Sequence, residues 1–206
     1  MKRPIILSEI KNDVHKAKSG TVFVPVDFAL ITDKKTASVC LTRLETEKIV
    51  FKLMRGVYYK PKNIGVVGEY IDPDVVAHAL ARNFGWTIVP CGDTALTLLG
   101  LSTQIPATWV YVSDGTYKEY TYGQTTLKFK RTTNKEISKL SYKTALVVQA
   151  LKTLGKDNVD EAILIKLQND LTENEKMNLL NEAKTATSWI YGYIKTICNS
   201  QSYIAK

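Results

Sequence analysis

The chain has few of the residues that build metal and redox sites, with two histidines and three cysteines in 206 residues. The cysteines, Cys40, Cys91 and Cys198, are odd in number and far apart, and none belongs to a C-x-x-C pair. A structural zinc ion needs four closely spaced ligands, which this distribution does not offer. We therefore expect all three cysteines to be reduced, and we expect no metal and no cofactor.

Long apolar runs and nucleotide-binding loops are also missing. No stretch approaches the roughly 18 consecutive apolar residues that a membrane-spanning helix needs. Residues 1–7 start with charge but turn polar at Ser8, so the apolar core of a signal peptide is not present. No glycine-rich phosphate loop occurs. The sequence predicts a cytoplasmic protein that does not associate with membranes.

The carboxylates that could support catalysis each have a structural explanation. Asp72 and Asp74 form the only D-x-D motif, at the expected start of a helix, where acids complement the helix dipole. Asp93 is expected to be the N-cap of another helix, and Asp114 precedes a glycine in a turn. Metal-assisted phosphodiester chemistry needs two or more convergent carboxylates. We therefore do not expect an enzyme, and we assign no catalytic residue.

Positive charge is concentrated at one end of the chain. Residues 1–62 hold 13 Lys and Arg against 6 Asp and Glu, whereas the other 144 residues hold 15 against 14. A basic N-terminal third beside a near-neutral remainder is typical of a polyanion-binding domain joined to a separate body. We therefore expect two domains, residues 1–62 and residues 66–200.

The order of elements in residues 1–62 indicates which polyanion is bound. Apolar residues recur at helical spacing over 6–17, and Pro25 opens a second, short helix over 26–31. Asp33 is a plausible N-cap for a third helix over 34–48, and a hairpin over 49–60 follows. This order is that of a winged helix-turn-helix, whose third helix lies in the major groove of DNA.

The outer face of the helix over 34–48 carries hydroxyls and cations in place of acids. Ala37, Cys40, Leu41 and Leu44 fall on the side that must face the core. On the other side, hydroxyls can contact phosphates or base edges, and Val39 could touch a thymine methyl group. The expected DNA contacts are Lys35, Ser38, Val39, Thr42 and Arg43 in the groove, Lys34 and Thr36 on phosphates, and Lys52, Arg55, Tyr58 and Lys60 on the hairpin.

A plainer reading exists for each of these features. A polar helix face with lysines is usually a solvated face, and Tyr58 or Tyr59 could simply pack across the hairpin. The hairpin, the helix and the charge asymmetry occur together, however, and together they favour binding of double-stranded DNA over the solvated face.

From residue 66 onward the sequence predicts an α+β body that ends in a helical bundle. The expected helices are 72–83, 93–99, 138–154, 160–171 and 173–198, and the expected strands are 86–89, 109–112, 117–122 and 125–130. Apolar stripes on the last helices, with Trp189, Tyr191 and Tyr193, either close the body's own core or form an interface. A protein-interaction module is thus the alternative function, and a homodimer through this region would suit paired DNA half-sites.

Two groups of motifs follow the pattern of a known family. The first is Val24-Pro25-Val26-Asp27-Phe28 with Leu44 and Arg55-Gly56-Val57-Tyr58-Tyr59-Lys60-Pro61; the second is the run 88–96, continued by 99–107 and by Tyr111-Val112-Ser113-Asp114-Gly115. In these residues the chain resembles AbiEi-type antitoxins of type IV toxin–antitoxin systems. The resemblance covers residues 20 to 131, and the helical tail agrees in kind only.

The resemblance implies a transcriptional repressor of its own operon, which binds inverted repeats in the promoter through the winged helix. It also implies an antitoxin activity in the C-terminal domain against an AbiEii-like nucleotidyltransferase toxin, which is opposed without a stable complex. Charge and periodicity indicate DNA binding, whereas the regulatory and antitoxin roles follow from the resemblance alone.

Overall fold

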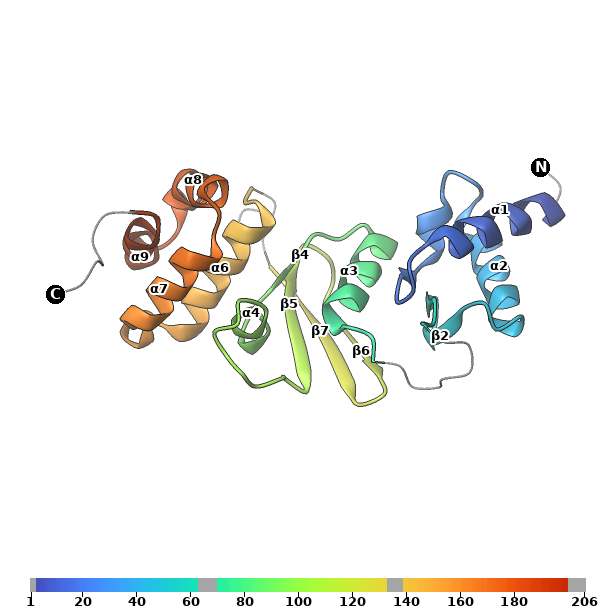
Figure 1. Ribbon diagram of the computed structural model, residues 1–206, viewed down its shortest axis with the longest axis horizontal. Coiled ribbons are helices and arrows are strands. Elements are labelled where there is room, and N and C mark those ends of the chain that lie inside the picture. Colours follow the sequence, from blue (N-terminus) through green and yellow to red (C-terminus); the bar gives the residue numbers. More distant parts are fainter. Residues whose placement is uncertain (1–2, 63–69, 133–138, 200–206) are drawn as a thin grey trace. The chain divides into compact units, whose positions relative to one another are not determined.

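The computed structural model of the chain describes residues 3–62, 70–132 and 139–199 (Figure 1). These residues form helices and two small sheets, which confirms the predicted α+β class. Their contacts define two compact units, the first made of residues 1–86 and 120–127 and the second of 87–119 and 128–206. The expected domain limit at residue 66, the helix start at 138 and the polar end beyond 199 lie outside the described residues.

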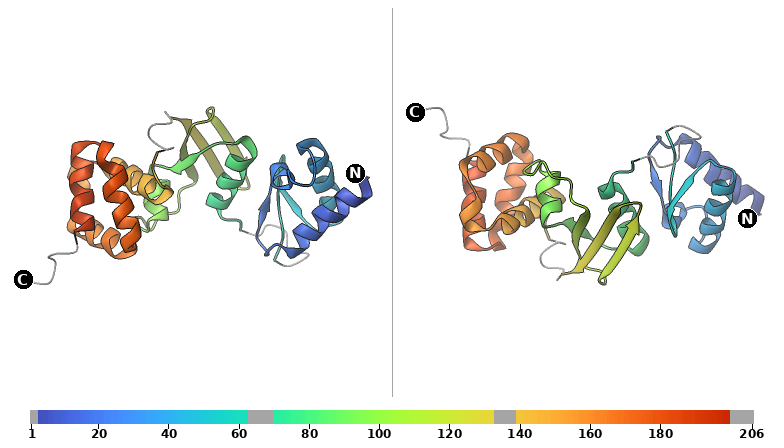
Figure 2. Two further views of the ribbon diagram at one scale, coloured as in Figure 1. Left: turned by 90° about the horizontal axis from the view of Figure 1, so that it is seen from above. Right: turned by 90° about the horizontal axis from the view of Figure 1, so that it is seen from below.

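The first unit is built on a three-stranded antiparallel sheet. Its elements are α1 (Arg3–Lys16), β1 (Val22–Phe23), the 3-10 helix η1 (Pro25–Phe28), α2 (Lys34–Thr46), β2 (Phe51–Met54), β3 (Val57–Tyr59) and α3 (Pro73–Phe84). The strand order is β1-β3-β2, so Tyr59 on the central strand pairs with Val22 on one side and with Phe51 on the other. The strands of this sheet are drawn in blue and cyan in Figure 2. The sheet thus joins segments that lie before and after α2.

The core of the first unit lies where the helical periodicity placed it. Ala37, Cys40, Leu41 and Leu44, the predicted inner face, are the buried residues of α2. They meet Ile10 of α1 and apolar residues of β1, η1 and β3 in one cluster. Because burial of such side chains stabilises the fold by roughly 1.5–3 kcal/mol each, this face fixes which side of α2 remains outside.

Tight turns join α2 to the hairpin. Lys48 has a φ of 57°, and the Leu44 carbonyl accepts hydrogen bonds from the amides of Ile49 (2.9 Å) and Val50 (3.4 Å). This left-handed residue ends the helix and directs the chain into β2. Gly56, with a φ of 76°, lies in the turn between Met54 and Val57, where a side chain would be strained. The hairpin therefore starts directly behind the end of α2.

One local prediction in this unit is wrong. The short helix expected over 26–31 is the single 3-10 turn Pro25–Phe28. On α3, Val75 is 42% exposed, whereas Ala77 is fully buried. Small alanines on a second side of α3 let it contact η1, β1 and β3 closely, which the apolar periodicity alone did not indicate.

The second unit combines strands with a helical bundle. Its strands are β4 (Ile88–Pro90) and β5 (Thr108–Ser113), together with parts of β6 (Lys118–Tyr122) and β7 (Thr125–Arg131), in the sheet order β4-β5-β7-β6. Its helices are α4 (Asp93–Leu98), α6 (Tyr142–Leu154), η2 (Lys156–Asn158), α7 (Glu161–Asp170), α8 (Glu173–Glu182), η3 (Ala183–Thr185) and α9 (Ser188–Cys198). None of the described helices is long and apolar enough to cross a membrane.

The helix predicted over 173–198 is two helices. After α8 and η3 the chain is extended at Ala186, with φ −67° and ψ 165°, before α9 begins. The reversal lets Leu179 and Ile190 enter the same core, and Trp189, Tyr191 and other residues of the apolar stripes pack against it. The stripes therefore close the unit's own core. A second correction concerns α4, whose N-cap is Gly92 and not the expected Asp93.

Candidate nucleic-acid interface

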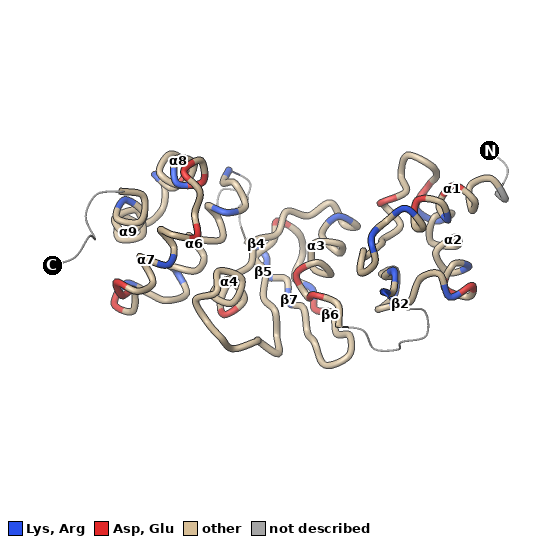
Figure 3. The backbone as a smooth tube through the Cα atoms, viewed as in Figure 1, with Lys and Arg blue, Asp and Glu red and all other residues tan. Residues whose placement is uncertain are grey.

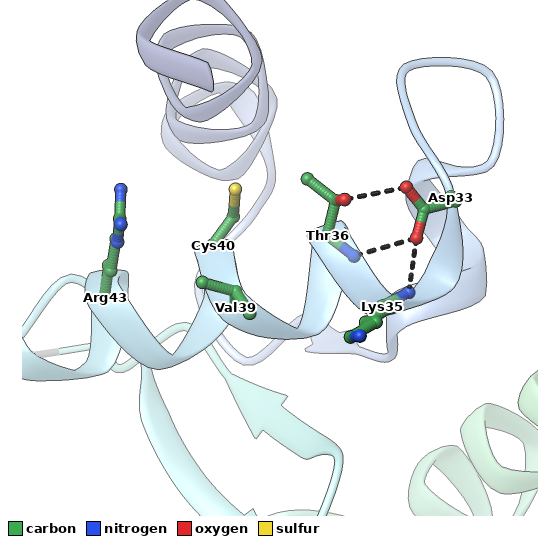
Figure 4. A pocket seen from close by; sticks show the side chains of 6 residues that line it. All are labelled: Asp33, Lys35, Thr36, Val39, Cys40 and Arg43. Atoms are coloured by element: carbon green, nitrogen blue, oxygen red, sulfur yellow. Dashed lines mark hydrogen bonds between the residues drawn. The ribbon is translucent and has the colours of Figure 1, made fainter.

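The N-terminus of α2 is fixed by Asp33. Its carboxylate accepts hydrogen bonds from the amides of Lys35 (2.9 Å) and Thr36 (3.0 Å) and from the Thr36 hydroxyl (2.7 Å) (Figure 4). These bonds, that of the Thr36 hydroxyl foremost, lower the pKa of Asp33. The predicted N-cap is confirmed, and it sets the rotation at which the first turn of α2 presents its side chains.

A shallow groove of about 290 Å³ runs along the outer side of α2. It is lined by Asp33, Lys35, Thr36, Val39, Cys40 and Arg43, four of which are among the expected DNA contacts (Figure 4). Lys35 and Arg43 are exposed, and Val39 between them is 49% exposed. Three of the five residues expected in the DNA groove, Lys35, Val39 and Arg43, thus line this groove on the surface of α2.

The serine and threonine hydroxyls of α2 are used inside the helix. Ser38 donates to the Lys34 carbonyl (2.8 Å), Thr42 to that of Ser38 (3.0 Å) and Thr46 to that of Thr42 (3.1 Å). A hydroxyl has one proton, so these side chains keep only acceptor capacity. Phosphate oxygens are acceptors too, and in this arrangement Ser38 and Thr42 have no proton to offer them.

Lys34 is held by the C-terminus of α3. Its ammonium group donates to the Asn83 carbonyl (2.7 Å) and lies 5.7 Å from the centre of the Phe84 ring. The Phe84 ring in turn stacks on Trp86 at 4.7 Å. A cation near a helix C-terminus is favoured by the helix dipole. In this position Lys34 ties α2 to α3.

Lys60 and Tyr58 also serve the fold of the unit. The Lys60 ammonium group donates to the carbonyls of His15 (2.7 Å) and Ala17 (2.8 Å), the last acceptors at the end of α1. Tyr58 is only 4% exposed, and its hydroxyl lies 3.2 Å from the Thr42 hydroxyl. Tyr59 is buried as well, with its ring centre 5.9 Å from that of Phe51. Both hairpin tyrosines thus pack against the protein.

The exposed cations of the hairpin are Lys52 and Arg55. Within the described residues their side chains make no hydrogen bond or ion pair, and the same holds for Lys35 and Arg43 on α2. Figure 3 shows basic residues along both α2 and β2. The first unit as a whole holds 14 Lys and Arg against 9 Asp and Glu, because the acids near α3 offset part of the excess. Positive charge therefore belongs mainly to the α1–β3 part.

An arginine clamp that the sequence did not indicate holds η1. Arg82 donates to both carboxylate oxygens of Asp27 (3.0 and 3.2 Å), and Asp27 also accepts from the Val24 amide (2.9 Å). Because η1 contacts both α2 and α3, this pair helps to place α2. The Val24–Asp27 part was visible as a local turn, but nothing in the sequence links it to a residue 55 positions away.

Two of the carboxylates considered for catalysis have structural partners. Asp72 caps α3 by accepting from the Asp74 amide (2.9 Å), and Asp114 accepts from the Thr87 amide (2.8 Å). In the described part of the chain, no three His, Cys, Asp or Glu side chains lie close enough to hold a metal ion. Cys40 and Cys91 are free and buried, and burial raises the pKa of both thiols.

A family model described as "Family of unknown function (DUF6088)" matches residues 9–179. The chain belongs to this family. The DUF6088 match begins within α1 and ends within α8, so it includes α2, the hairpin and most of the second unit, while α9 lies beyond it. No curated protein matches this DUF6088 chain. The family match therefore includes parts of both units, but it assigns no activity to either.

Proposed function

We propose that this DUF6088 protein is a cytoplasmic DNA-binding transcriptional repressor. In this proposal the first unit is a winged helix-turn-helix that inserts α2 into the major groove of double-stranded DNA, with the β2–β3 hairpin as its wing. The observation that carries it is the open face of α2, where Lys35 and Arg43 flank a groove while Asp33 anchors the helix start.

The order of elements supports the same proposal. The segment runs α1, β1, η1, α2, β2, β3, and its sheet has the order β1-β3-β2. In the helix-turn-helix arrangement the second helix of the motif lies in the groove and the first crosses the backbone. Here η1 and α2 take these two positions, and Lys52 and Arg55 on the hairpin would neutralise flanking phosphates.

We divide the eleven expected contact residues according to their partners. Direct contact is proposed for Lys35, Val39, Arg43, Lys52 and Arg55. Thr36, Ser38 and Thr42 act through acceptor capacity only, and Lys34, Tyr58 and Lys60 support the interface by holding α2, the hairpin and α1 in place.

The regulatory part of the proposal extends the resemblance to AbiEi-type antitoxins. The protein would repress its own operon at inverted repeats, for which a homodimer supplies two-fold symmetry. The second unit would oppose a nucleotidyltransferase toxin encoded beside it, without a stable complex and without catalysis of its own. If no such toxin is encoded there, a plain regulator is the better description.

A salt titration tests DNA binding directly. Lys35→Gln, Arg43→Gln and Arg55→Gln together should weaken binding to the duplex upstream of the gene by about a hundredfold near 0.1 M salt. The slope of log affinity against log salt should also become shallower, by about 0.9 for each phosphate that is no longer neutralised. Fluorescence anisotropy of a labelled duplex over a salt series measures both quantities.

The matched control removes the same charge from the second unit. Lys139→Gln, Lys156→Gln and Lys184→Gln, all at exposed positions, should leave affinity and slope close to those of the unchanged protein. If the two triple variants weaken DNA binding equally, the loss of affinity depends on net charge alone and not on the position of the cations. Unchanged affinity in the α2 and hairpin variant, with circular dichroism showing a folded protein, would reject the interface.

A further inference from the structure

Val39 is the one apolar side chain on the outer face of α2 in the described structure. It is 49% exposed and lines the groove with Lys35 and Arg43, which stand four residues before and after it (Figure 4). Residues four apart lie on the same face of a helix, about 6 Å apart along its axis. The three residues therefore follow one another along the groove, with the valine in the centre and a cation at each end, and the Arg43 side chain points to the side of Thr36 and Cys40 (Figure 4).

The fold itself does not account for a valine at this position. Val39 is absent from the buried cluster that α2 forms with α1, η1 and β3. Its β-branched side chain is less favourable in a helix than alanine or the straight-chain residues. An exposed site on a short helix would be better served by such residues, so helix stability gives no reason for a valine here.

The hydroxyl groups beside Val39 are poorly placed to distinguish bases by donating hydrogen bonds. Thr36 gives its hydroxyl proton to Asp33, and Ser38 and Thr42 give theirs to carbonyls of α2. Base edges in the major groove are distinguished by donors, acceptors and one apolar group, the C5-methyl group of thymine. On this face the side chain that matches the apolar group is Val39.

We propose that Val39 selects thymine in the bound sequence by contacting its C5-methyl group, with Lys35 and Arg43 holding the helix on either side. The inference rests on the proposed function, because it requires α2 to lie in the major groove. It adds a specificity-determining residue to that function and defines the chemical feature that it reads.

Removal of one methyl group from the DNA tests this role of Val39. The full-length protein first selects duplexes from a pool with a randomised centre. The enriched duplex is then resynthesised with deoxyuridine in place of each thymine in turn, which deletes the methyl group and keeps every base-pair hydrogen bond. We expect one thymine in each half-site at which this change lowers affinity about fourfold, the effect of burying one such group.

The protein variants complete the cycle. Val39→Ala should bind the thymine and deoxyuridine duplexes equally, because the shortened side chain no longer reaches the methyl group. Val75→Ala removes the same two methyl groups from another exposed valine of the first unit, 42% exposed on α3, and should keep the full thymine dependence.

The possible results separate the two levels of the proposal. Equal binding of thymine and deoxyuridine duplexes by the unchanged protein at every position overturns the role of Val39 and leaves DNA binding intact. Persistence of the thymine dependence in Val39→Ala also overturns it. A protein that enriches no duplex from the pool overturns the proposed function, and this inference with it.

Discussion

The basic side chains of the two units make different kinds of contacts. In the first unit Lys34, Lys60 and Arg82 bind groups 49, 45 and 55 residues away along the chain. In the second unit Lys166 and Lys176 pair with acids four and three residues away on the same helix. The first set fastens separate elements to one another, whereas the second adds a few tenths of a kcal/mol to single helices.

Not all of the basic residues in positions 1–62 are available to a ligand. Part of the basic excess in residues 1–62 is structural, because Lys34 and Lys60 are committed to backbone carbonyls. Among the cations that remain exposed, Lys35 and Arg43 line the groove on α2, and Lys52 and Arg55 lie on the hairpin. The side chains proposed to bind DNA are therefore those that folding leaves exposed and, within the described residues, without a partner, whatever the total charge.

The largest effect is expected in cells, where DNA binding by the first unit and the proposed antitoxin activity of the second can be tested separately. The full-length protein with Lys35→Gln, Arg43→Gln and Arg55→Gln, expressed from an unrelated promoter, should still rescue growth from the co-expressed nucleotidyltransferase that we propose as its toxin. The reason is that these positions lie on the first unit, whereas the proposed antitoxin activity lies in the second.

Growth with and without induction of the toxin measures rescue, and immunoblotting controls for protein level. If the triple variant accumulates normally, represses nothing and also fails to rescue, the two activities do not divide between the units. The long-range contacts of basic residues in the first unit and the local ones in the second would then reflect how each unit folds, and not a division of function.

The next effect concerns a carboxylate that holds two helices of the second unit. Glu182 accepts hydrogen bonds from the amide (2.7 Å) and the hydroxyl (2.8 Å) of Ser141, the N-cap residue of α6. Burial raises the pKa of Glu182, but these bonds and one with Thr144 outweigh it, so the pKa lies below its ordinary value of 4.5. The ionised form therefore stabilises the folded state above about pH 4.5, and this contribution is lost as the pH falls through the lowered pKa.

Glu182→Gln should lower the free energy of unfolding by about 1–2 kcal/mol at pH 7, because one charged acceptor becomes a neutral one. The deficit should shrink at pH 3.5, where the carboxylate of the unchanged protein is increasingly protonated. Urea unfolding at the two pH values measures this, with Glu161→Gln, an exposed acid in the first turn of α7, as the control. If Glu182→Gln lowers the free energy of unfolding equally at both pH values, the side chain stabilises the fold by packing and not by its charge.

The parts of the fold that depend on local pattern were predictable. The inner face of α2, the Asp33 cap and the turn at Gly56 follow from periodicity and from the preferences of single residues. The break between α8 and α9 was not predictable. The residues on both sides of it favour a helix, and the chain reverses there because both helices pack into one core.

The candidate site was predictable to a similar extent. A helical wheel places Lys35 and Val39 on the outer side of α2 with Arg43 at its edge, and in the structure all three line one groove. The wheel cannot show that Lys34 is taken up by the Asn83 carbonyl or that Arg82 reaches Asp27. Such contacts depend on tertiary neighbours about 50 residues away, for which a single sequence carries no signal.

The smallest expected effect is a gain, and it concerns the one acid on the groove. Asp33 lies beside Lys35 on the lining, where its charge would face the phosphates of bound DNA. Asp33→Asn should keep the cap, since the remaining side-chain oxygen can accept from the amides of Lys35 and Thr36, and asparagine caps as well as aspartate. Removing the charge should tighten DNA binding by about threefold at low salt, and the gain should fade as salt is raised.

Asp33→Ala is the matched control: it removes the same charge but also the cap, at a cost of about 1 kcal/mol in stability. If Asp33→Asn binds the duplex no more tightly than the unchanged protein at any salt concentration, the start of α2 does not face the DNA backbone, and the lysine next to it would have to be reassigned.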